Sequence, residues 1–239
     1  MKFLQKIFIT SIFFILFTPS IKAQMDSVTS ELNQNNDWPN LRRYRSENAQ
    51  LTTPSKENRV VFMGNSITDG WINASPGFFK DNPYLDRGIS GQTTPQMLIR
   101  FRQDVIDLKP KVVVILAGIN DIAGNTGPSS VQMIENNFAS MAQLAKANGI
   151  KVVLCSVLPA YDIPWKPGLD PKQKISELNQ WIKNYAAKNR FVYCDYFSAM
   201  ADERKGLPAD LSKDGVHPTE KGYQVMEPIV KKAIAEALR

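Results

Sequence analysis

Short apolar segments alternate with segments of helical periodicity along most of this chain, and this alternation restricts the fold more than any other feature. Several of the short segments are apolar on both faces, which is typical of parallel strands covered by helices on each side. Strands and helices in strict succession require right-handed crossover connections. The sequence therefore predicts an α/β fold, a three-layer α/β/α sandwich with about five parallel strands. The predicted strands are 59–63, 84–88, 111–116, 151–157 and 190–193.

Helices are predicted between these strands, where apolar residues recur at steps of three and four. One helix is expected to end at Asn148-Gly149, because glycine is common just after a helix. Another is expected to open with Asp170 as its capping residue and Pro171 at its first helical position. The predicted helical segments lie at about 98–108, 131–145 and 175–185, and a closing helix begins near Thr219.

Polar residues follow three of the predicted strands, at the point where each strand ends. In open parallel α/β sheets, ligands bind at the carboxyl ends of the strands. We therefore expect the functional site at this edge of the sheet, next to a long loop at 159–170 that contains Pro, Tyr and Trp. The polar clusters are 64–66, 90–91 and 118–121.

The first 23 residues have the pattern of a secretory signal. Lys2 and Lys6 precede an apolar run at 7–17, and small Ala23 suits the position before a cleavage point. The run is well short of the roughly 20 residues that a bilayer-spanning helix needs. We therefore predict a signal peptide at 1–23, an N-terminal extension at 24–57 and one domain at 58–239. The protein is expected in the periplasm or outside the cell without a stable membrane anchor, and an uncleaved anchor is the alternative.

The charge distribution does not favour a nucleic-acid partner. The formal charge of +6 falls to +3 when the predicted signal peptide is removed with its three lysines. The remaining lysines and arginines are scattered among acidic residues, without the basic stripe and interleaved aromatics of a nucleic-acid surface. The apolar fraction of 43% agrees with a single buried core.

The two cysteines lie in predicted buried strands, Cys155 in 151–158 and Cys194 in 191–195. Small buried thiols are the favoured interpretation, and a cross-strand disulfide is the alternative. The pair has neither the spacing nor the histidine partners of a zinc site. The sequence therefore predicts no metal.

His217 is the only histidine of the chain and lies in a predicted loop before the last helix. Asp214, three residues earlier, can fold back so that its carboxylate accepts a hydrogen bond from the Nδ1–H group, which leaves Nε2 free to take a proton. A general base needs this orientation. The alternative is that this lone histidine is a bystander, hydrogen-bonded or exposed.

Ser66 follows the first predicted strand in the segment Gly64-Asn-Ser66. A hydroxyl at this place is a candidate nucleophile for activation by His217. The alternative is that Ser66 caps a helix. The segment is not a phosphate loop, because the Gly-Lys-Ser/Thr spacing is absent, so a nucleotide-binding flavodoxin-like module is not favoured.

Four segments together resemble the conserved blocks of the SGNH/GDSL hydrolases. They occur in the family's order and the resemblance covers about 58–236, which is far more specific than any single block. Within the family, the chain is most similar to the acetylhydrolase-like branch, which includes platelet-activating-factor acetylhydrolase catalytic subunits and bacterial carbohydrate O-acetylesterases. The blocks are Val61-Phe-Met-Gly-Asn-Ser-Ile-Thr-Asp-Gly70, Asp86-Arg-Gly-Ile-Ser-Gly-Gln-Thr-Thr94, Leu116-Ala-Gly-Ile-Asn-Asp121 and Asp214-Gly-Val-His217.

The resemblance implies a flavodoxin-like SGNH hydrolase fold and a role for each matching residue. Ser66 would be the nucleophile, and Asp214 and His217 would complete the triad. The N–H groups of Ser66 and Gly91 and the side-chain amide of Asn120 would form the oxyanion hole. Removing one such donor costs about 3–4 kcal/mol of transition-state stabilisation. The alternatives are that Asn120 and Gly91 are turn residues only.

One position departs from the family's pattern, because Asn65 stands where Gly-Asp-Ser has its aspartate. The triad acid comes from the last block, so we expect the change to affect the hydrogen bonds of the loop more than the mechanism. The implied reaction is attack by Ser66, while His217 takes its proton and returns it to the leaving alcohol. No cofactor is required.

The expected substrate is a small-molecule or glycan ester with a short acyl group, acetyl above all. No long apolar lid is visible in the sequence, and aromatic residues such as Trp165 lie in the predicted strand-end loops. Aromatic rings beside a polar site suit sugars, although they can equally be packing residues. The candidate substrate-binding residues are Trp71, Ile119, Tyr161 and Val216.

Two rival functions remain at this stage. A lysophospholipase or thioesterase of the same family would hydrolyse longer acyl chains faster than acetyl. A noncatalytic glycan-binding protein on the same scaffold would have no use for a base and nucleophile pair. Neither the natural ester nor the oligomeric state follows from the sequence.

Overall fold

The computed structural model describes residues 36–51 and 58–239. The predicted signal peptide at 1–23, and much of the predicted extension at 24–57, lie outside the described residues. Within the described parts, no helix is long and apolar enough to cross a membrane.

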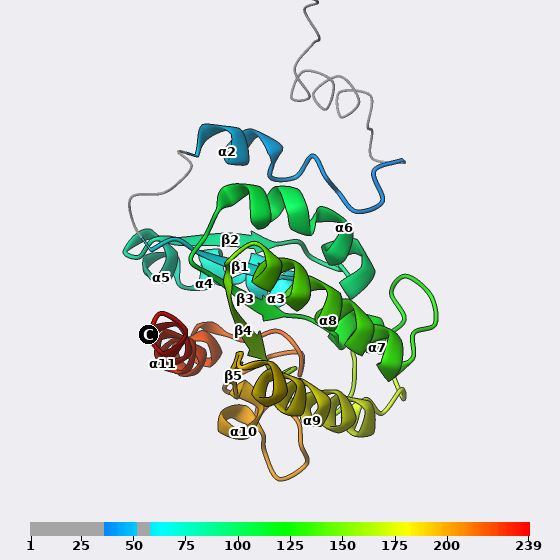
Figure 1. Cartoon of the computed structure of the whole chain (residues 1–239). Coiled ribbons are helices and arrows are strands. Elements are labelled where there is room, and N and C mark those ends of the chain that lie inside the picture. The colour runs from blue at the N-terminus through cyan, green and yellow to red at the C-terminus, as the bar shows by residue number, and fades with distance from the viewer. Residues whose placement is uncertain (1–35, 52–57) are drawn as a thin grey trace, which may run out of the picture.

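A sheet of five parallel strands, in the order β2-β1-β3-β4-β5, forms the centre of the molecule (Figure 1). Neighbouring strands run in register, so that Gly64 pairs with Gly88 on one side and with Leu116 on the other. The predicted α/β sandwich with five parallel strands is therefore confirmed. The strands are β1 (Val60–Gly64), β2 (Tyr84–Gly88), β3 (Val112–Leu116), β4 (Lys151–Cys155) and β5 (Val192–Cys194).

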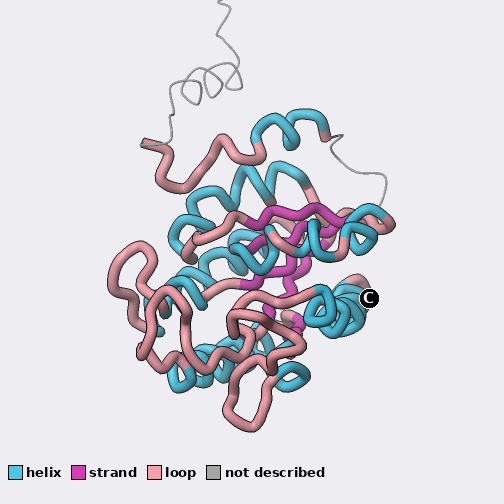
Figure 2. The backbone as a smooth tube through the Cα atoms, turned by 180° about the vertical axis from the view of Figure 1, so that it is seen from behind, coloured by secondary structure: helices cyan, strands magenta, loops and turns pink. Residues whose placement is uncertain are grey.

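Helices cover both faces of the sheet, as the view from behind also shows (Figure 2). Helices α6 (Thr94–Asp104), α8 (Val131–Ala147) and α9 (Lys172–Asn189) contact one another in sequence and cover one face (Figure 1). Helix α11 (Glu220–Ala237) packs against β3, β4 and β5 on the other face. Shorter helices complete the fold: α2 (Arg45–Gln50), α3 (Ser66–Asp69), α4 (Trp71–Ala74), α5 (Pro76–Lys80), α7 (Ile119–Ile122) and α10 (Tyr196–Met200).

Strand β4 ends at Cys155, two residues before the predicted end. The side chain of Asn179 in α9 hydrogen-bonds the backbone of Val157. Its Oδ1 accepts from the Val157 N–H group at 2.7 Å, and its Nδ2 donates to the Val157 carbonyl at 3.0 Å. A side chain from the covering helix thus replaces the neighbouring strand as the hydrogen-bond partner.

Two helix ends differ from the sequence prediction, and two agree with it. Asp170 does not cap α9, because its backbone is left-handed with φ 44° and the helix begins at Lys172 without a side-chain cap. The Asp170 carboxylate instead pairs with Lys172 Nζ at 2.7 Å. The segment predicted at 98–108 is helix α6 only to Asp104, followed by a 3-10 turn at Ile106–Leu108. The predicted end of α8 at Asn148-Gly149 and the start of α11 after Thr219 are confirmed.

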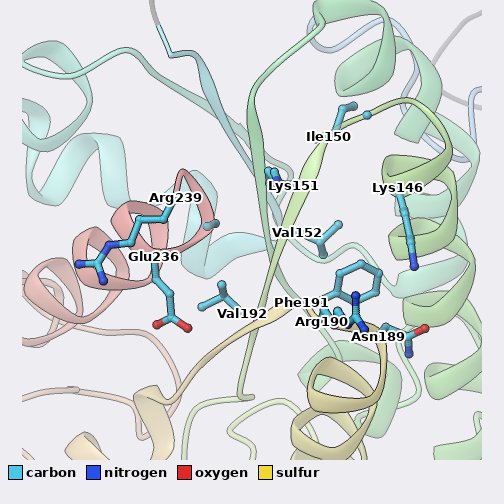
Figure 3. A pocket seen from close by; sticks show the side chains of 12 residues that line it. Lys146, Ile150, Lys151, Val152, Asn189, Arg190, Phe191, Val192, Glu236 and Arg239 are labelled. Carbon is cyan, nitrogen blue, oxygen red and sulfur yellow. The ribbon is translucent and has the colours of Figure 1, made fainter.

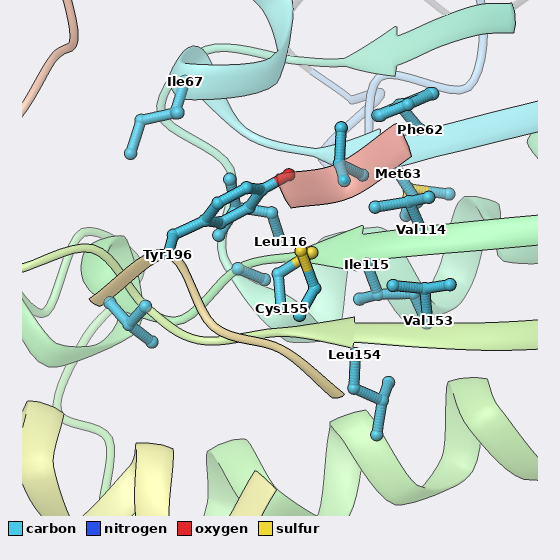
Figure 4. Close-up of a cluster of buried hydrophobic side chains, with 14 of the residues drawn as sticks. Phe62, Met63, Ile67, Val114, Ile115, Leu116, Val153, Leu154, Cys155 and Tyr196 are labelled. Carbon is cyan, nitrogen blue, oxygen red and sulfur yellow. The ribbon is translucent and has the colours of Figure 1, made fainter. Parts of the chain in front are cut away.

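The core lies where the strands meet the covering helices. Phe62 is paired with Val114, and Ile115 is paired with Leu154 on the next strand, and all four side chains are buried (Figure 4). Cys155 and Cys194 are buried free thiols in register with each other on neighbouring strands. The cross-strand disulfide is thus not the state of this structure.

Two glycines allow helix α3 to lie directly on the ends of β1 and β2. A Cβ atom on Gly88 would lie 2.1 Å from the backbone nitrogen of Asp69, and one on Gly64 would lie 2.0 Å from Thr68 Oγ1. Both distances are far shorter than van der Waals contact. Only glycine therefore permits this approach, and it is this approach that places Ser66, the first residue of α3, above the sheet edge.

Candidate active site

Ser66 begins helix α3 immediately after β1. Asn65 caps this short helix, because its Oδ1 accepts a hydrogen bond from the N–H group of Ile67 at 3.1 Å. The alternative interpretation of Ser66 as the cap is therefore not supported. Asn65 stands where the family's Gly-Asp-Ser has its aspartate. Its amide oxygen takes part in a local hydrogen bond of the loop, as expected.

The Ser66 hydroxyl and the His217 imidazole meet although 151 residues separate them in the chain. Ser66 Oγ lies 2.8 Å from His217 Nε2, and His217 Nδ1 lies 2.6 Å from Asp214 Oδ2. The order hydroxyl, imidazole and carboxylate is that of a Ser-His-Asp triad. The structure thus brings together the three residues that the sequence predicts for proton transfer.

Asp214 is held in place by the turn that it starts. Its Oδ1 accepts hydrogen bonds from the backbone N–H groups of Val216 and His217 at 2.9 and 2.8 Å, and Gly215 adopts the left-handed conformation, with φ 82°, inside this turn. Partial burial alone would raise the pKa of this carboxyl, but the hydrogen bonds from His217 and Val216 outweigh it and lower the pKa to about 2. Asp214 is therefore a carboxylate at any pH at which the protein is assayed.

The candidate oxyanion donors come from the ends of three adjacent strands. Ser66 follows β1, Gly91 follows β2 and Asn120 lies in α7 after β3. Gly91 has φ 79° and open space where a Cβ atom would stand. Asn120 is buried and donates one Nδ2 hydrogen to the Gln92 carbonyl at 2.9 Å, which leaves its second hydrogen for another acceptor.

The loop that carries Gly91 is held by α3, the helix that begins with Ser66. Asp69 of α3 accepts from the Ser90 hydroxyl at 2.6 Å and from the Ser90 N–H group at 3.2 Å, both through Oδ2. Two hydrogen bonds thus connect this loop to α3. Asp69 and Ser90 belong to two different blocks of the family resemblance, 61–70 and 86–94. The spacing of these blocks along the chain does not predict the contact.

Arg100 is fully buried beneath the site and was not among the predicted site residues. It donates to Gln92 Oε1 at 2.6 Å, to the Gly64 carbonyl at 3.0 Å and to the Arg87 carbonyl at 2.8 Å, and it pairs with Asp104 at 3.0 Å. It thus ties together the ends of β1 and β2. One sequence signal could have identified this buried pair. Arg100 and Asp104 are four residues apart, on the same face of α6 as the apolar residue Met97.

Asp121, next to Asn120, anchors helix α6 to the site. Its carboxylate accepts from both the N–H group and the hydroxyl of Thr94, at 3.0 and 2.5 Å. Burial raises the pKa of Asp121 to about 6, although the hydrogen bonds from Thr94 oppose this shift. Its side-chain partners are the hydroxyl and N–H group of Thr94, the first residue of α6.

The predicted substrate-binding role of Trp71 is wrong. The Trp71 side chain is 1% exposed and stacks between Phe78 and Tyr223, with ring centroids at 4.7 and 5.1 Å. It therefore packs the core beneath α4 and does not reach the sheet edge. A four-residue helix gives no periodicity from which its inward face could be predicted.

Ile119 and Val216 are buried beside the candidate catalytic residues. Together with Ile67 and Leu158 they line an apolar cavity of only about 10 Å³. Ile67, Ile119 and Val216 are the sequence neighbours of Ser66, Asn120 and His217, so the cavity lies against the site. A volume of this size is about that of one small group.

Two aromatic residues of the loop at 159–170 lie on the outer side of the site. Tyr161 is half exposed, and a cavity of about 260 Å³ lies between it and Asp214. Trp165 stands over His217 with ring centroids 5.8 Å apart, and its Nε1 donates to Asn125 Oδ1 at 2.9 Å. Asn125 was not among the predicted site residues.

A further cavity of about 640 Å³ lies at the opposite edge of the sheet (Figure 3). Lys151 and Val152 at the start of β4 line it together with Glu236 and Arg239 at the chain's end. It is remote from the carboxyl ends of the strands and holds none of the candidate catalytic residues. Among the described residues, no group of three His, Cys, Asp or Glu side chains could hold a metal ion.

Known proteins with a similar structure or sequence agree with this geometry. A GDSL-like lipase from Bacteroides thetaiotaomicron is 52% identical with a TM-score of 0.81, over 84% of this chain and 99% of that one. Esterase TesA from Pseudomonas aeruginosa is 28% identical over 70% of this chain and 83% of its own length. An acetylxylan esterase from Xylanibacter ruminicola is 27% identical over 74% of this chain and 43% of its own length.

The chain spans about half the length of two of the curated relatives that it matches. The family model of the GDSL-like lipases and acylhydrolases matches residues 62–225, which is well over half of the chain. That range contains the ends of the first three strands and the turn of Asp214 and His217. The chain therefore belongs to the GDSL-like lipase/acylhydrolase family.

Proposed function

We propose that this protein is a serine esterase that hydrolyses short-chain acyl esters, above all acetyl esters, through an acyl-enzyme. The observation that carries the proposal is the 2.8 Å contact between Ser66 Oγ and His217 Nε2, with Asp214 on the other ring nitrogen. A nucleophile and a base within hydrogen-bond reach, with the base oriented by a third group, are the requirements of nucleophilic acyl transfer.

In the proposed acylation step, Ser66 Oγ forms a bond to the ester carbonyl carbon and passes its proton to His217 Nε2. The carbonyl oxygen becomes an oxyanion, which the N–H groups of Ser66 and Gly91 and the amide of Asn120 would stabilise. The carbon–oxygen bond to the alcohol then breaks, and His217 returns the proton to the leaving alkoxide. Asp214 holds the imidazole and stabilises its transient positive charge.

Deacylation repeats these steps with water. His217 takes a proton from the water molecule as its oxygen attacks the acyl carbon, and it gives that proton to Ser66 as the acyl–enzyme bond breaks. The products are the carboxylic acid and the restored hydroxyl. The net reaction consumes one water for each ester, and none of these steps calls on a metal or cofactor.

The preference for a short acyl group is supported by the residues around the nucleophile. The apolar cavity beside it, lined by Ile67, Ile119 and Val216, has a volume of only about 10 Å³. The surrounding side chains are fully packed core residues, so a long acyl chain would require them to move. A group as small as a methyl matches this space, which favours acetyl.

A carbohydrate as the alcohol portion is supported by three observations. One curated relative is named for the hydrolysis of acetylxylan. Trp165 presents its ring beside His217, and half-exposed aromatic rings suit the apolar faces of sugars. The signal-like pattern at 1–23 supports export, where such substrates are met.

The proposal is tested with p-nitrophenyl esters of graded chain length and with acetylated polysaccharides. Wild-type protein should hydrolyse the acetate faster than the octanoate, and Ser66→Ala should lower kcat by at least about 10³-fold. Ser140→Ala is the matched control, because Ser140 is a surface residue of α8 whose hydroxyl bonds only the Asn136 carbonyl at 2.8 Å. Full turnover by Ser66→Ala would overturn the proposal, and faster octanoate hydrolysis would favour a lysophospholipase or thioesterase.

A further inference from the structure

Residues 36–51 run along helix α6, and three glutamine side chains hold their backbone there. Gln92 Nε2 donates to the Pro39 carbonyl at 2.7 Å, Gln96 Nε2 to the Trp38 carbonyl at 2.8 Å and Gln103 Nε2 to the Leu41 carbonyl at 2.6 Å. The Tyr44 hydroxyl also donates to the Gly88 carbonyl at the end of β2. The segment is therefore a fixed part of the molecule beside the site.

The segment is also rigid within itself. Asp37 is buried and accepts from the N–H groups of Leu41 and Arg42 at 2.8 and 3.1 Å, around a turn in which Asn40 has a φ of 55°. The Trp38 ring, by contrast, is 51% exposed. A large indole on a backbone that is anchored on both sides can offer a pre-organised face to a ligand, because little conformational freedom remains to be lost on binding.

A cavity of about 480 Å³ lies between this segment and the loop that carries Gly91. Its volume is within the usual range of small-molecule sites. Asn125 links it to the candidate catalytic residues, since Nδ2 donates to the Gly91 carbonyl at 3.3 Å and Oδ1 accepts from Trp165, which stands over His217. The lining comes from both sides and includes Trp38, Asn40, Arg42, Ser90, Asn125 and Thr126.

We propose that this cavity, with Trp38 and its neighbours as one wall, binds the polyol portion of the ester substrate. This inference rests on the proposed esterase function and adds a site for the leaving alcohol. The small apolar cavity at Ile67 takes the acyl group, so the larger polar cavity is the space that remains for the other half of the ester. Its lining offers a guanidinium, amides and hydroxyls, which pair with sugar hydroxyls, and one indole for the apolar face of a ring.

The chemistry of the lining separates a sugar from a lipid. Among its eleven residues, Trp38 and Ile89 are the large apolar ones, while Asn40, Arg42, Asn125 and Thr126 have partly or fully exposed polar side chains. A lipid alcohol would leave such groups without partners on binding, which is unfavourable. The segment thus makes this family member selective for acetylated carbohydrates.

The extent of structural similarity agrees with a segment that belongs to the domain. The Bacteroides thetaiotaomicron structure matches 84% of this chain, whereas residues 58–239 make up only about three quarters of it. The match must therefore include part of the chain before residue 58.

The test compares Trp38→Ala, Trp38→Phe and Ile99→Ala on O-acetylated xylotriose, O-acetylated mannotriose and p-nitrophenyl acetate. Ile99 is the matched control, because it is likewise 51% exposed but lies on α6 outside the cavity lining. Trp38→Ala should raise KM for a sugar acetate about 3- to 10-fold more than KM for p-nitrophenyl acetate. Trp38→Phe should keep most of the preference, and Ile99→Ala should match wild type on all three.

Binding without turnover gives a second measurement. Calorimetric titration of unacetylated xylotriose and mannotriose into Ser66→Ala should give binding that Ser66→Ala/Trp38→Ala loses, while both proteins keep the wild-type circular dichroism spectrum. Equal effects of Trp38→Ala on sugar and nitrophenyl esters, or binding that survives without Trp38, would overturn the subsite. So would a wild-type enzyme that hydrolyses p-nitrophenyl acetate but neither sugar acetate. If Ser66→Ala keeps full activity on p-nitrophenyl acetate, the proposed function fails instead.

Discussion

The guanidinium of Arg100 donates a hydrogen bond through Nε to Oε1 of Gln92 at 2.6 Å, inside the core and below the candidate oxyanion hole. The carbonyl of the same glutamine accepts from Asn120 Nδ2 at 2.9 Å. A buried cation is thereby connected through one residue to a donor of the site. Gln92 is a positioning residue in this arrangement, because it touches Asn120 and not the reacting atoms.

Gln92→Ala is expected to lower kcat for p-nitrophenyl acetate about 10-fold with little change in KM. The oxyanion exists only in the transition state, so a displaced Asn120 reduces kcat and leaves ground-state binding nearly intact. Gln92→Glu keeps an acceptor for Arg100 and should restore most of kcat. Steady-state kinetics of the three proteins decide this, and an equal loss in both variants would show that the Arg100 contact is not what positions Asn120.

Asp214→Asn is expected to lower kcat by about 10³- to 10⁴-fold, because an amide that donates to Nδ1 favours the wrong imidazole tautomer. Asp210→Asn provides the control, since Asp210 is a nearby exposed aspartate whose carboxylate pairs with Lys221 Nζ at 2.6 Å. The control should keep wild-type kcat. Comparable losses in the two variants would indicate a general disturbance of the loop.

The acid limb of the pH–activity profile should correspond to the loss of a single proton. The pKa of Asp214 is lowered to about 2, so this carboxylate stays ionised over the assay range and contributes no proton to the acid limb of the profile. The logarithm of kcat/KM should therefore rise with pH at a slope of one before it levels. A limiting slope of two would mean that Asp214 or another second group also binds a proton in this range.

Gly88→Ala is expected to lower the free energy of unfolding by about 3 kcal/mol, because the added methyl would overlap the backbone of Asn65, Thr68 and Asp69. Gly77→Ala in α5 is the control, since its Cβ would meet only the end of the Asp81 side chain at 3.2 Å. Urea denaturation measures both. Equal stability of the two variants would show that α3 does not depend on its close approach to β2.

Stability should fall between about pH 4 and pH 7 in a way that depends on Asp86. Burial raises the pKa of Asp86 from 3.8 to about 7 against the Gly88 hydrogen bond, and its Oδ2 has no hydrogen-bond partner among the described residues. In this window the folded state holds a proton that the unfolded chain has released, so the free energy of unfolding decreases as pH rises.

Asp86→Asn removes this titration and should flatten the decline by up to about 1.4 kcal/mol per pH unit. The comparison is made on slopes from urea denaturation at several pH values, because the substitution also changes the absolute stability. Asp104 and Asp121 titrate in both proteins and cancel in the difference. Parallel slopes in wild type and Asp86→Asn would contradict the assignment.

Most of the fold could be predicted from the sequence because its signals are local. Apolar segments of strand length determined the five strands, and Asn148-Gly149 determined the end of α8. The spacing of Asp214 and His217 likewise predicted a contact within one turn, which the structure has at 2.6 Å. Such features depend on backbone geometry over a few residues, and any chain with that local sequence tends toward them.

Other features were decided only when distant segments packed together. The 2.8 Å contact between Ser66 and His217 joins residues 151 positions apart, the inward ring of Trp71 depends on Phe78 and Tyr223, and the place of residues 36–51 depends on glutamines near α6. No local pattern encodes these contacts, because each exists only between surfaces that the completed sheet brings face to face. The sequence by itself determined the elements and the edge where chemistry occurs, and the tertiary structure decided which side chains meet there.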